Sequence, residues 1–324
     1  MNFTNQKSIR ALALAALIAM PLLAPSTAKA VFNLGGAEAY GIIFQGAGNN
    51  TLQITNVSMN GINGNVGVAG TGQATISGPS SISGNVYFSA ANTGQFSSNN
   101  NSNTYNGGAG PQGTSYVPFY NTAGVQSSMN YLNNTSQTAN GFAGTSVAIN
   151  GNQTLNASAG AVFTLNLQLV HVFNASSFTN GGNQTLTING SASDLVVINL
   201  GGLGNIQFHG GIAFTGGIGI DNVIFNVGGG NYVTNTGGAS LDINNNGGAA
   251  GVAQGIFLNP NGAISLVNAD IFGRVYGGDA HDFQFVSGVN ITVPGGQVPD
   301  AGSALALLGI GLAFLAGAKR KFRS

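Results

Sequence analysis

The repeat that decides the fold is Ile62-Asn63-Gly64-Asn65-Val66-Gly67-Val68, which returns 20 residues later as Ile82-Ser83-Gly84-Asn85-Val86-Tyr87-Phe88. A third version stands at Ile271-Phe272-Gly273-Arg274-Val275-Tyr276. A separate repeat, Gly151-Asn152-Gln153-Thr154-Leu155, returns after 31 residues as Gly182-Asn183-Gln184-Thr185-Leu186. About 20 residues suit one coil of a β-solenoid, in which short strands stack coil on coil around an apolar interior. The sequence therefore predicts a β-solenoid, with a β-sandwich as the alternative.

Short β-type runs recur between turns rich in Gly and Asn along the whole body of the chain. They are rich in β-branched and aromatic residues, which favour strands. The predicted strands are residues 40–44, 51–54, 74–76, 86–88, 162–165, 186–188, 195–198, 223–225, 255–258 and 264–266.

One segment has the spacing of a helix instead. Val125, Met129 and Leu132 fall at i, i+4 and i+7, and Ala139 lies on the same side. This pattern predicts a helix over residues 122–140, which ends at Asn140-Gly141. The Gly/Ser/Asn-rich stretch before it, residues 93–115, is predicted to be a surface loop.

The N-terminus has the three parts of a secretory signal peptide. Lys7 and Arg10 precede a short apolar run, and Ala28-Lys29-Ala30 forms an A-x-A cleavage site. We expect signal peptidase to remove residues 1–30, so that the mature chain begins at Val31. An uncleaved N-terminal anchor is the alternative.

The C-terminal segment, residues 298–324, also has three parts. The polar motif of residues 298–303 leads into an apolar run, residues 301–318, and a basic cluster, residues 319–323. As a helix, the apolar run is about 27 Å long, close to the ~30 Å hydrocarbon thickness of a bilayer. Basic residues prefer the cytoplasmic side, so this tail is predicted to stop translocation with the body outside.

This tail resembles the PEP-CTERM sorting signals recognised by bacterial exosortases, and most of all the variant that begins Val-Pro-Asp-Ser-Gly. The matching residues are Val298, Pro299, Asp300 and Gly302, whereas Ala301 replaces the usual Ser. The resemblance implies transient insertion into the inner membrane, cleavage near the motif by an exosortase, and delivery to the outer surface or extracellular matrix of a Gram-negative bacterium. Hydropathy fits a permanent single-span anchor equally well.

The body resembles the choice-of-anchor A domains and related ice-binding-like domains. The segments that carry the likeness are residues 34–41, 64–68, 221–227, 255–261 and 271–278. The resemblance implies a β-solenoid body, residues 31–297, fitted with a C-terminal surface anchor, and it brings no catalytic residues.

Charge is sparse in the body and excludes several functions. Residues 31–297 hold one cation, Arg274, and seven carboxylates. One cation cannot neutralise a phosphate backbone, so nucleic-acid binding is not expected. The chain has no Cys, which excludes disulfides and thiolate metal sites.

One cluster of polar residues has side chains that could catalyse a reaction or bind a metal ion: Asp270, Arg274, Asp279, His281 and Asp282. Paired carboxylates could hydrolyse a glycosidic bond, and oxygen ligands could hold calcium. Calcium loops, however, have alternating acidic residues that are missing here. We favour a structural interpretation, in which Arg274 pairs with Asp270 or Asp282 at the edge of a coil, and we predict no metal or cofactor.

Together these features predict a non-catalytic, exported protein with a structural or adhesive role, whose expected partners are exopolysaccharide or other surface glycans. The alternatives are an enzyme that acts on polysaccharides and an ice-binding protein. Ice binding needs a flat face with a regular rank of Thr or similar small residues. Thr185 and Thr187 form one such pair, but no T-x-T array continues along the chain.

Overall fold

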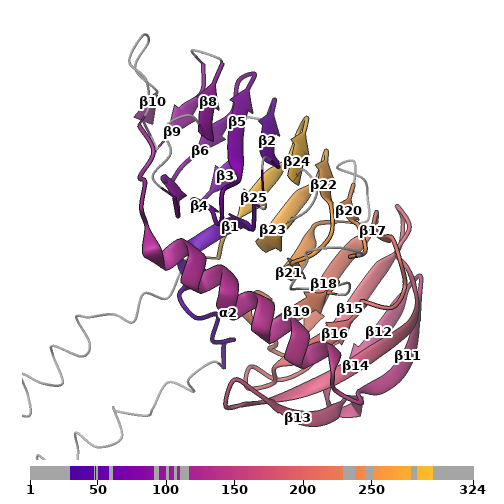
Figure 1. Ribbon diagram of the computed structural model, residues 1–324. Helices are drawn as coiled ribbons and strands as arrows, with labels where there is room; N and C mark the ends of the chain where they lie inside the picture. Colours follow the sequence, from indigo (N-terminus) through magenta and orange to yellow (C-terminus); the bar gives the residue numbers. More distant parts are fainter. Residues whose placement is uncertain are drawn as a thin grey trace, which may run out of the picture.

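The computed structural model of the chain describes residues 30–294, apart from 47, 49, 58–60, 91–94, 100–101, 106–107, 110–116, 229–237, 245–250 and 279–282. Its strands stack coil on coil, almost all of them in parallel, into a β-solenoid with three faces (Figure 1). The predicted solenoid is therefore confirmed, and the two antiparallel sheets of a β-sandwich are not found among the described residues.

The first face is the one that a long helix covers. Its strands are β1 (Tyr40–Phe44), β4 (Asn65–Val68), β7 (Val86–Phe88), β11 (Thr145–Asn150), β14 (Gln168–Thr179), β16 (Val196–Asn199), β19 (Val223–Asn226) and the C-terminal halves of β21 (Ala253–Asn259) and β23 (Asp270–Gly277). At one end, β13 (Ala161–Leu165) adds an antiparallel hairpin partner to β14.

The second and third faces complete the coils. The second comprises β17 (Ile206–Phe208), β20 (Leu241–Ile243), β22 (Ile264–Val267), β24 (Phe283–Val286), β2 (Thr51–Thr55), β5 (Gln73–Ser77) and β8 (Phe96–Ser98). The third begins with β12 (Gln153–Asn156), β15 (Thr185–Asn189) and β18 (Gly211–Thr215), and continues through the N-terminal halves of β21 and β23, β25 (Asn290–Thr292), β3 (Ile62–Asn63), β6 (Ser81–Ile82), β9 (Thr104–Tyr105) and β10 (Gly108–Ala109).

Register confirms that the 20-residue repeat is one coil. Ile62 pairs with Ile82, and Val66 pairs with Val86, in neighbouring parallel strands. The 31-residue repeat also falls on neighbouring coils, but Leu155 pairs with Ile188, two residues beyond the position that the repeat predicts. A shift of two residues keeps each side chain on the same face, so the inward and outward pattern is unchanged.

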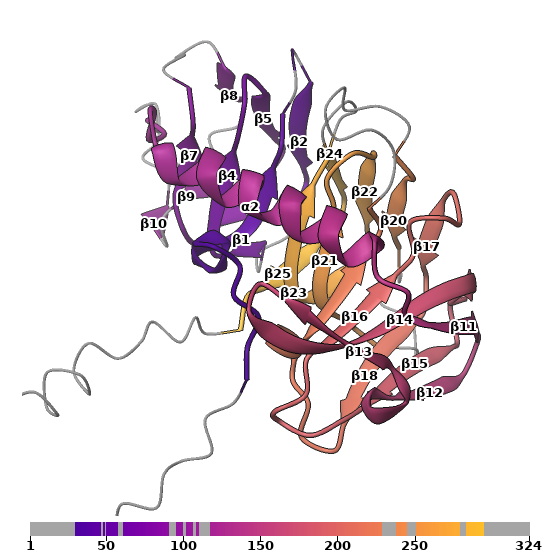
Figure 2. The same ribbon diagram turned by 60° about the horizontal axis from the view of Figure 1, so that its bottom comes forward.

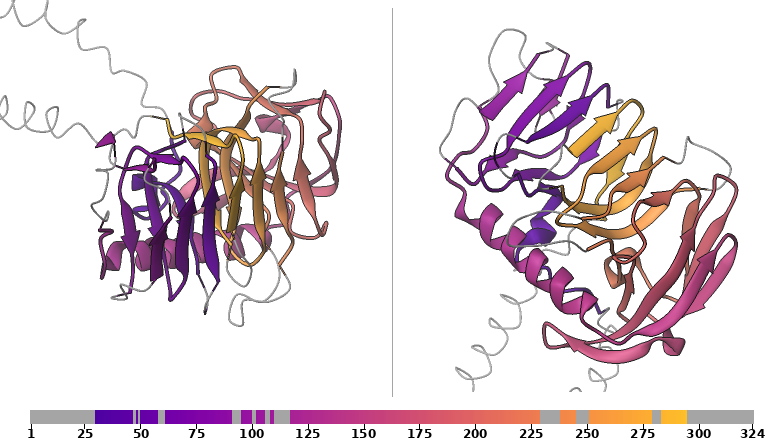
Figure 3. Two further views of the ribbon diagram at one scale, coloured as in Figure 1. Left: turned by 90° about the horizontal axis from the view of Figure 1, so that it is seen from above. Right: turned by 45° about the vertical axis from the view of Figure 1, so that its right-hand side comes forward.

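The coils are not stacked in the order of the sequence. The chain builds its first coils from the middle of the stack outward to one end. Helix α2 (Ala123–Asn140) then runs back along the outside to the other end (Figures 1 and 2). From β11 the chain builds new coils back toward the first coil, until β23, β24 and β25 pair with β1, β2 and β3. Figure 3 shows the resulting single stack from two further sides.

The core has two layers. Inside the coils, apolar residues of all three faces stack into ladders such as Phe208, Phe225 and Phe257, whose ring centroids lie 5.2–5.3 Å apart. The second layer lies between the first face and α2, where Val125, Met129 and Leu132 are fully buried. The predicted helix and its apolar side are thus confirmed, with the first helical residue one position later than predicted.

The ten predicted strands all lie on strands, with bounds that differ by at most two residues. The prediction for residues 93–115 is wrong in part, because β8, β9 and β10 lie within that stretch. Phe96 and Tyr105 explain the difference: their rings lie 6.2 Å apart, and Tyr105 is buried. Two aromatic side chains give this polar stretch enough apolar surface to add a coil.

Candidate functional site

The predicted polar cluster is divided by a sharp corner in β23. Gly273 has φ 150°, and a Cβ placed on it would lie 1.9 Å from the backbone oxygen of Gly255. Asp270 precedes this corner and lies on the third face, whereas Arg274 follows it and lies on the first face. Asp279, His281 and Asp282 lie outside the described residues.

Among the described residues, Arg274 pairs with Asp221 and not with Asp270, while the other predicted partner, Asp282, lies outside these residues. The guanidinium Nη1 of Arg274 donates to Oδ1 of Asp221, a residue outside the predicted cluster. Arg274 is only 2% exposed, and Asp221 is 28% exposed. The corner at Gly273 explains the change, since it turns Arg274 away from Asp270 and toward the N-terminal segment that covers the first face.

Around this pair, buried groups hold the N-terminal segment, residues 30–40, against the solenoid. The hydroxyl of Tyr276 donates to the backbone oxygens of Ala37 and Tyr40 at 2.8 and 3.0 Å. The amide Nδ2 of Asn222 donates to the oxygen of Ala30 at 2.7 Å. Because Tyr276 is fully buried, desolvation raises the pKa of its hydroxyl far above the ordinary value of 10, and Glu38 and Asp221 add to this effect while Arg274 opposes it. These contacts indicate a structural role for the cluster, which holds the N-terminal segment on the solenoid.

Two histidines also have carboxylate neighbours, although each looks isolated in the sequence. Nε2 of His171 lies 3.7 Å from Oδ1 of Asp194, and Nε2 of His209 lies 3.2 Å from Oδ2 of Asp242. The partners come from neighbouring coils, which explains why sequence spacing does not reveal them. In the described part of the chain, no three acidic, His or Cys side chains converge as they would around a metal ion.

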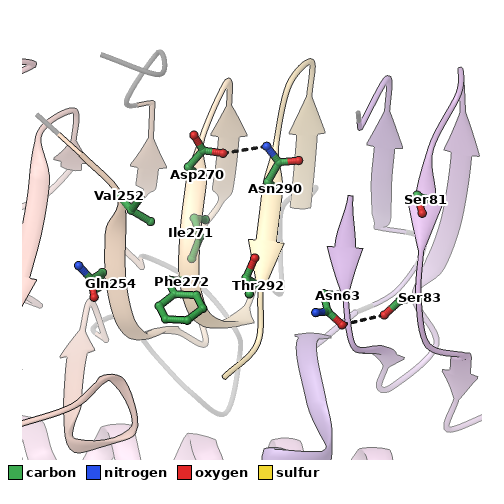
Figure 4. Close-up of a pocket in the computed structure, with 10 residues that line it drawn as sticks. All are labelled: Asn63, Ser81, Ser83, Val252, Gln254, Asp270, Ile271, Phe272, Asn290 and Thr292. Carbon is green, nitrogen blue, oxygen red and sulfur yellow. Dashed lines mark hydrogen bonds between the residues drawn. The ribbon is translucent and has the colours of Figure 1, made fainter. Parts of the chain in front are cut away.

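A groove on the third face is the best candidate for a binding site (Figure 4). It crosses the N-terminal parts of β21 and β23, then β25, β3 and β6, and has a volume of about 670 Å³. Its lining combines exposed apolar side chains with amides, hydroxyls and one carboxylate: Asn63, Ser81, Ser83, Val252, Gln254, Asp270, Ile271, Phe272, Asn290 and Thr292.

Register places much of this lining in one straight rank, which we call the outward rank: Gln254, Phe272, Thr292, Asn63 and Ser83. Gln254 pairs with Phe272, Phe272 with Thr292, and Thr292 with Asn63. Ser83 follows Asn63 on the next coil, because Ile62 pairs with Ile82. Neighbouring strands lie about 4.8 Å apart, so the rank extends roughly 19 Å along the solenoid axis.

Beside the outward rank, Asp270 and Asn290 form the start of a second one. Nδ2 of Asn290 donates to Oδ1 of Asp270 at 2.8 Å. Among the described residues that line the groove, Asp270 is the one carboxylate, and none is a cation. Hydrolysis of a glycosidic bond needs two carboxyl groups that flank it, so the described lining suits binding and not this chemistry.

The groove was not predicted from the sequence, although the repeat contains its signal. Each copy has the pattern Ile, variable residue, Gly, and the variable residues are Asn63, Ser83 and Phe272. The Ile side chains point inward and are buried, so the middle residues point outward. We used the repeat to predict the coil but did not use its outward positions.

No helix in the described residues is both long and apolar enough to cross a bilayer, and the predicted span of residues 301–318 lies outside them. The predicted signal peptide lies outside them too, except for its last residue, Ala30.

Comparison with known proteins supports the reading of the tail. Residues 297–322 match the model of the VPDSG-CTERM motif. The chain thus carries a sorting tail of this type, which indicates an exported, surface-sorted protein. No curated protein matches the chain.

Among solved structures, the chain is similar to several ice-binding proteins. The protein LeIBP from an Arctic yeast shares 14% identity, with 82% of this chain and 94% of that chain covered and a TM-score of 0.47. The protein from the Antarctic ascomycete Antarctomyces psychrotrophicus also shares 14% identity, with 82% and 99% covered and a TM-score of 0.46. One from an Antarctic bacterium of the Flavobacteriaceae shares 16%, with 84% and 52% covered and a TM-score of 0.44.

Proposed function

We propose that this protein is exported and processed at both ends, and then serves a structural or adhesive role at the outer surface or in the extracellular matrix of a Gram-negative bacterium. The observation that carries the proposal is the VPDSG-CTERM tail behind a complete solenoid. A tail of this type serves delivery, and the solenoid supplies a long surface with several ranks of polar side chains.

Processing at the proposed sites would leave the solenoid intact. Val31 is 44% exposed, and the coil that precedes the tail ends with β25 at Thr292. Cleavage after Ala30 removes two hydrogen bonds, one from Asn222 to the oxygen of Ala30 and one from the N–H of Ala30 to the oxygen of Ala192, whereas the backbone bond from Phe32 to Asp221 remains. Signal peptidase and an exosortase are the proposed processing enzymes, with the inner membrane as a transient location.

Catalysis is not part of the proposal. Among the described residues, the groove presents a single carboxylate, Asp270, which is already hydrogen-bonded to Asn290. An enzyme that uses the predicted polar cluster would need Asp279 or Asp282, which lie outside the described residues. If the purified protein releases reducing ends from neutral or acidic glycans, and Asp279→Ala or Asp282→Ala abolishes this release, the non-catalytic role is wrong.

Ice binding is also not favoured by the exposed faces. The central outward rank of the second face runs Gln207, Asp242, Ser265, Gln284, Gln53, Thr75 and Ser97. A single Thr in this rank, among large amides and a carboxylate, does not make the regular array of small residues that ice binding needs. Inhibition of ice recrystallisation at micromolar protein would argue against this assessment.

The decisive experiment is an intact-mass measurement of protein recovered from the cell surface. The proposal expects an N-terminus at Val31 and a C-terminus between Pro299 and Gly302. A variant with Val298, Pro299 and Asp300 replaced by Ala should accumulate uncut in the membrane fraction. Surface protein that still carries residues 319–323 would identify a permanent anchor, and protein found only in the cytoplasm would overturn the proposal.

A further inference from the structure

We propose that the groove on the third face binds a linear, neutral polysaccharide, which lies along the outward rank. This inference rests on the proposed surface function, since it names the class of partner that an adhesive protein would hold there.

The shape of the groove fits an extended chain. The outward rank crosses five coils in a straight line, roughly 19 Å from Gln254 to Ser83. One rung, about 4.8 Å, is comparable to the length of one sugar unit, so consecutive units can meet consecutive side chains. The volume of about 670 Å³ lies within the usual range of ligand sites.

The side chains supply both kinds of contact that a sugar needs. Phe272 is 37% exposed on the face of a strand, and offers an apolar surface on which the C–H groups of a sugar ring can pack. Gln254 lies on one side of it, and Thr292 and Asn63 lie on the other (Figure 4). Amides and hydroxyls both donate and accept hydrogen bonds, as sugar hydroxyls do.

Several of these side chains are already held in place. Oγ of Ser83 donates to Oδ1 of Asn63 at 2.9 Å and accepts from the backbone N–H of Gly64 at 3.0 Å. Nε2 of Gln254 donates to the oxygen of Ile212 at 2.9 Å. Within the described residues, this leaves Nδ2 of Asn63 and Oε1 of Gln254, two residues that line the groove, without a hydrogen bond. Groups fixed before binding lose little conformational entropy when a ligand arrives.

Charge selects against an anionic ligand. The lining has no Lys or Arg and has one carboxylate, Asp270. The expected mature body carries one cation against seven carboxylates, so its field repels polyanions. A neutral glycan avoids this cost, whereas an acidic one such as alginate, or a phosphate-rich polymer, does not.

The test is calorimetric titration of the full-length chain, kept soluble in a mild detergent, with soluble hexaoses of β-1,4-glucan, β-1,3-glucan and α-mannan. An alginate hexaose is the anionic probe. At least one neutral hexaose should bind, and alginate should not. Phe272→Ala should raise the Kd about ten-fold or more, and Asn63→Ala about three-fold, because a few central contacts dominate binding. Phe272→Tyr should keep most of the affinity.

Phe119→Ala is the matched control, because Phe119 is also an exposed aromatic residue but is not among the residues that line the groove. Its affinity should remain close to that of the parent, even if loss of the stacking between its ring and Tyr87 lowers the melting temperature. If Phe272→Ala unfolds the chain, Asn63→Ala and Phe272→Tyr still report on the groove.

The proposal is wrong if no neutral hexaose binds or if alginate binds more tightly than the neutral hexaoses. It is also wrong if Phe272→Ala and Asn63→Ala both bind with the affinity of the parent. None of these results touches the surface location, which the mass measurement decides separately. Conversely, a cytoplasmic location would overturn the proposed function while the titration still reports on the groove.

Discussion

At the scale of single residues, the one cation of the body, Arg274, is buried. Arg274 is 2% exposed and pairs with Asp221, next to the fully buried Tyr276. A buried charge is tolerated only when a partner compensates for lost hydration. These residues fix the N-terminal segment to the first face, so Arg274, the one cation of the body, has a structural role.

Removing the carboxylate should therefore be more damaging than removing the cation. Asp221→Ala leaves the guanidinium of Arg274 buried and uncompensated, and should lower the free energy of unfolding by about 3 kcal/mol. Arg274→Met keeps the volume and leaves a carboxylate that is 28% exposed and can be hydrated, so it should cost about 1 kcal/mol. Urea unfolding of both variants checks the order, and equal losses would contradict the asymmetry.

Tyr276 should make the protein sensitive to alkali. Its pKa is raised in the folded state, so its stabilising effect is complete below the unfolded pKa of 10 and is lost as the pH rises above that value. Tyr276→Phe loses the hydrogen bonds to Ala37 and Tyr40, and should cost about 1–2 kcal/mol at pH 7. The same variant should show a shallower fall in stability between pH 10 and 12.

Urea titrations at several pH values measure this difference. Some alkaline slope should persist in Tyr276→Phe, because the pKa values of Tyr40, Tyr120 and Tyr131 are also raised by desolvation. Parallel pH profiles in the parent and the variant would show that Tyr276 does not contribute.

At the scale of elements, the fold depends on corners within strands and on polar ladders under the helix. Nδ2 of Asn226 donates to Oδ1 of Asn199, and Nδ2 of Asn199 donates in turn to Oδ1 of Asn174, both at 2.9 Å. The same ladder holds the last turns of α2, through Ser136 and the oxygen of Ala139. These buried amides set the position of the helix on the first face.

The corner in β23 should tolerate no side chain. Gly273→Ala would place Cβ 1.9 Å from a backbone oxygen at φ 150°, and should lower the free energy of unfolding by at least ~2 kcal/mol. Gly202→Ala is the matched control, because nothing lies within 4 Å of its Cβ position. Thermal melts that shift equally for the two variants would show that the corner is not strained.

The elements also show where sequence reasoning succeeds. The strands and α2 follow from their apolar patterns, because α2 buries one regular side and the strands either alternate, as β2 does, or are apolar and buried throughout, as β16 is. The amide ladder could not be predicted in this way, since Asn174, Asn199 and Asn226 resemble the many surface Asn residues of the chain. The ion pair between Arg274 and Asp221 was not predicted for a related reason: Asp221 lies 53 residues earlier, and only the stacking of coils brings it near.

At the scale of the whole molecule, the first and last coils of the body form one continuous stack. Ile42 pairs with Val275, and Ile62 pairs with Ile291, across more than 200 residues of sequence. The repeat predicts that coils stack but not the order in which they do, because each coil presents similar edges to either neighbour. The groove depends on this order, since Phe272 and Asn63 share one rank only because β25 pairs with β23 on one side and β3 on the other.

The junction should unfold as one unit. Ile291→Ala removes a fully buried side chain and should cost about 2–4 kcal/mol. Hydrogen exchange should then accelerate to the same extent in β1 and β3 as in β23 and β25, because neither half keeps its edge covered without the other. Faster exchange confined to residues 270–292 would show that the two halves open independently.

The place where the tail leaves the solenoid has a mechanical consequence. β25 is the last described strand before the tail, and it is hydrogen-bonded on both sides, to β23 and to β3. A pulling force applied through the segment that follows β25 therefore enters the stack at an inner rung and not at a fraying end. The load is divided between coils above and below, so the body can be held under tension without being peeled away coil by coil.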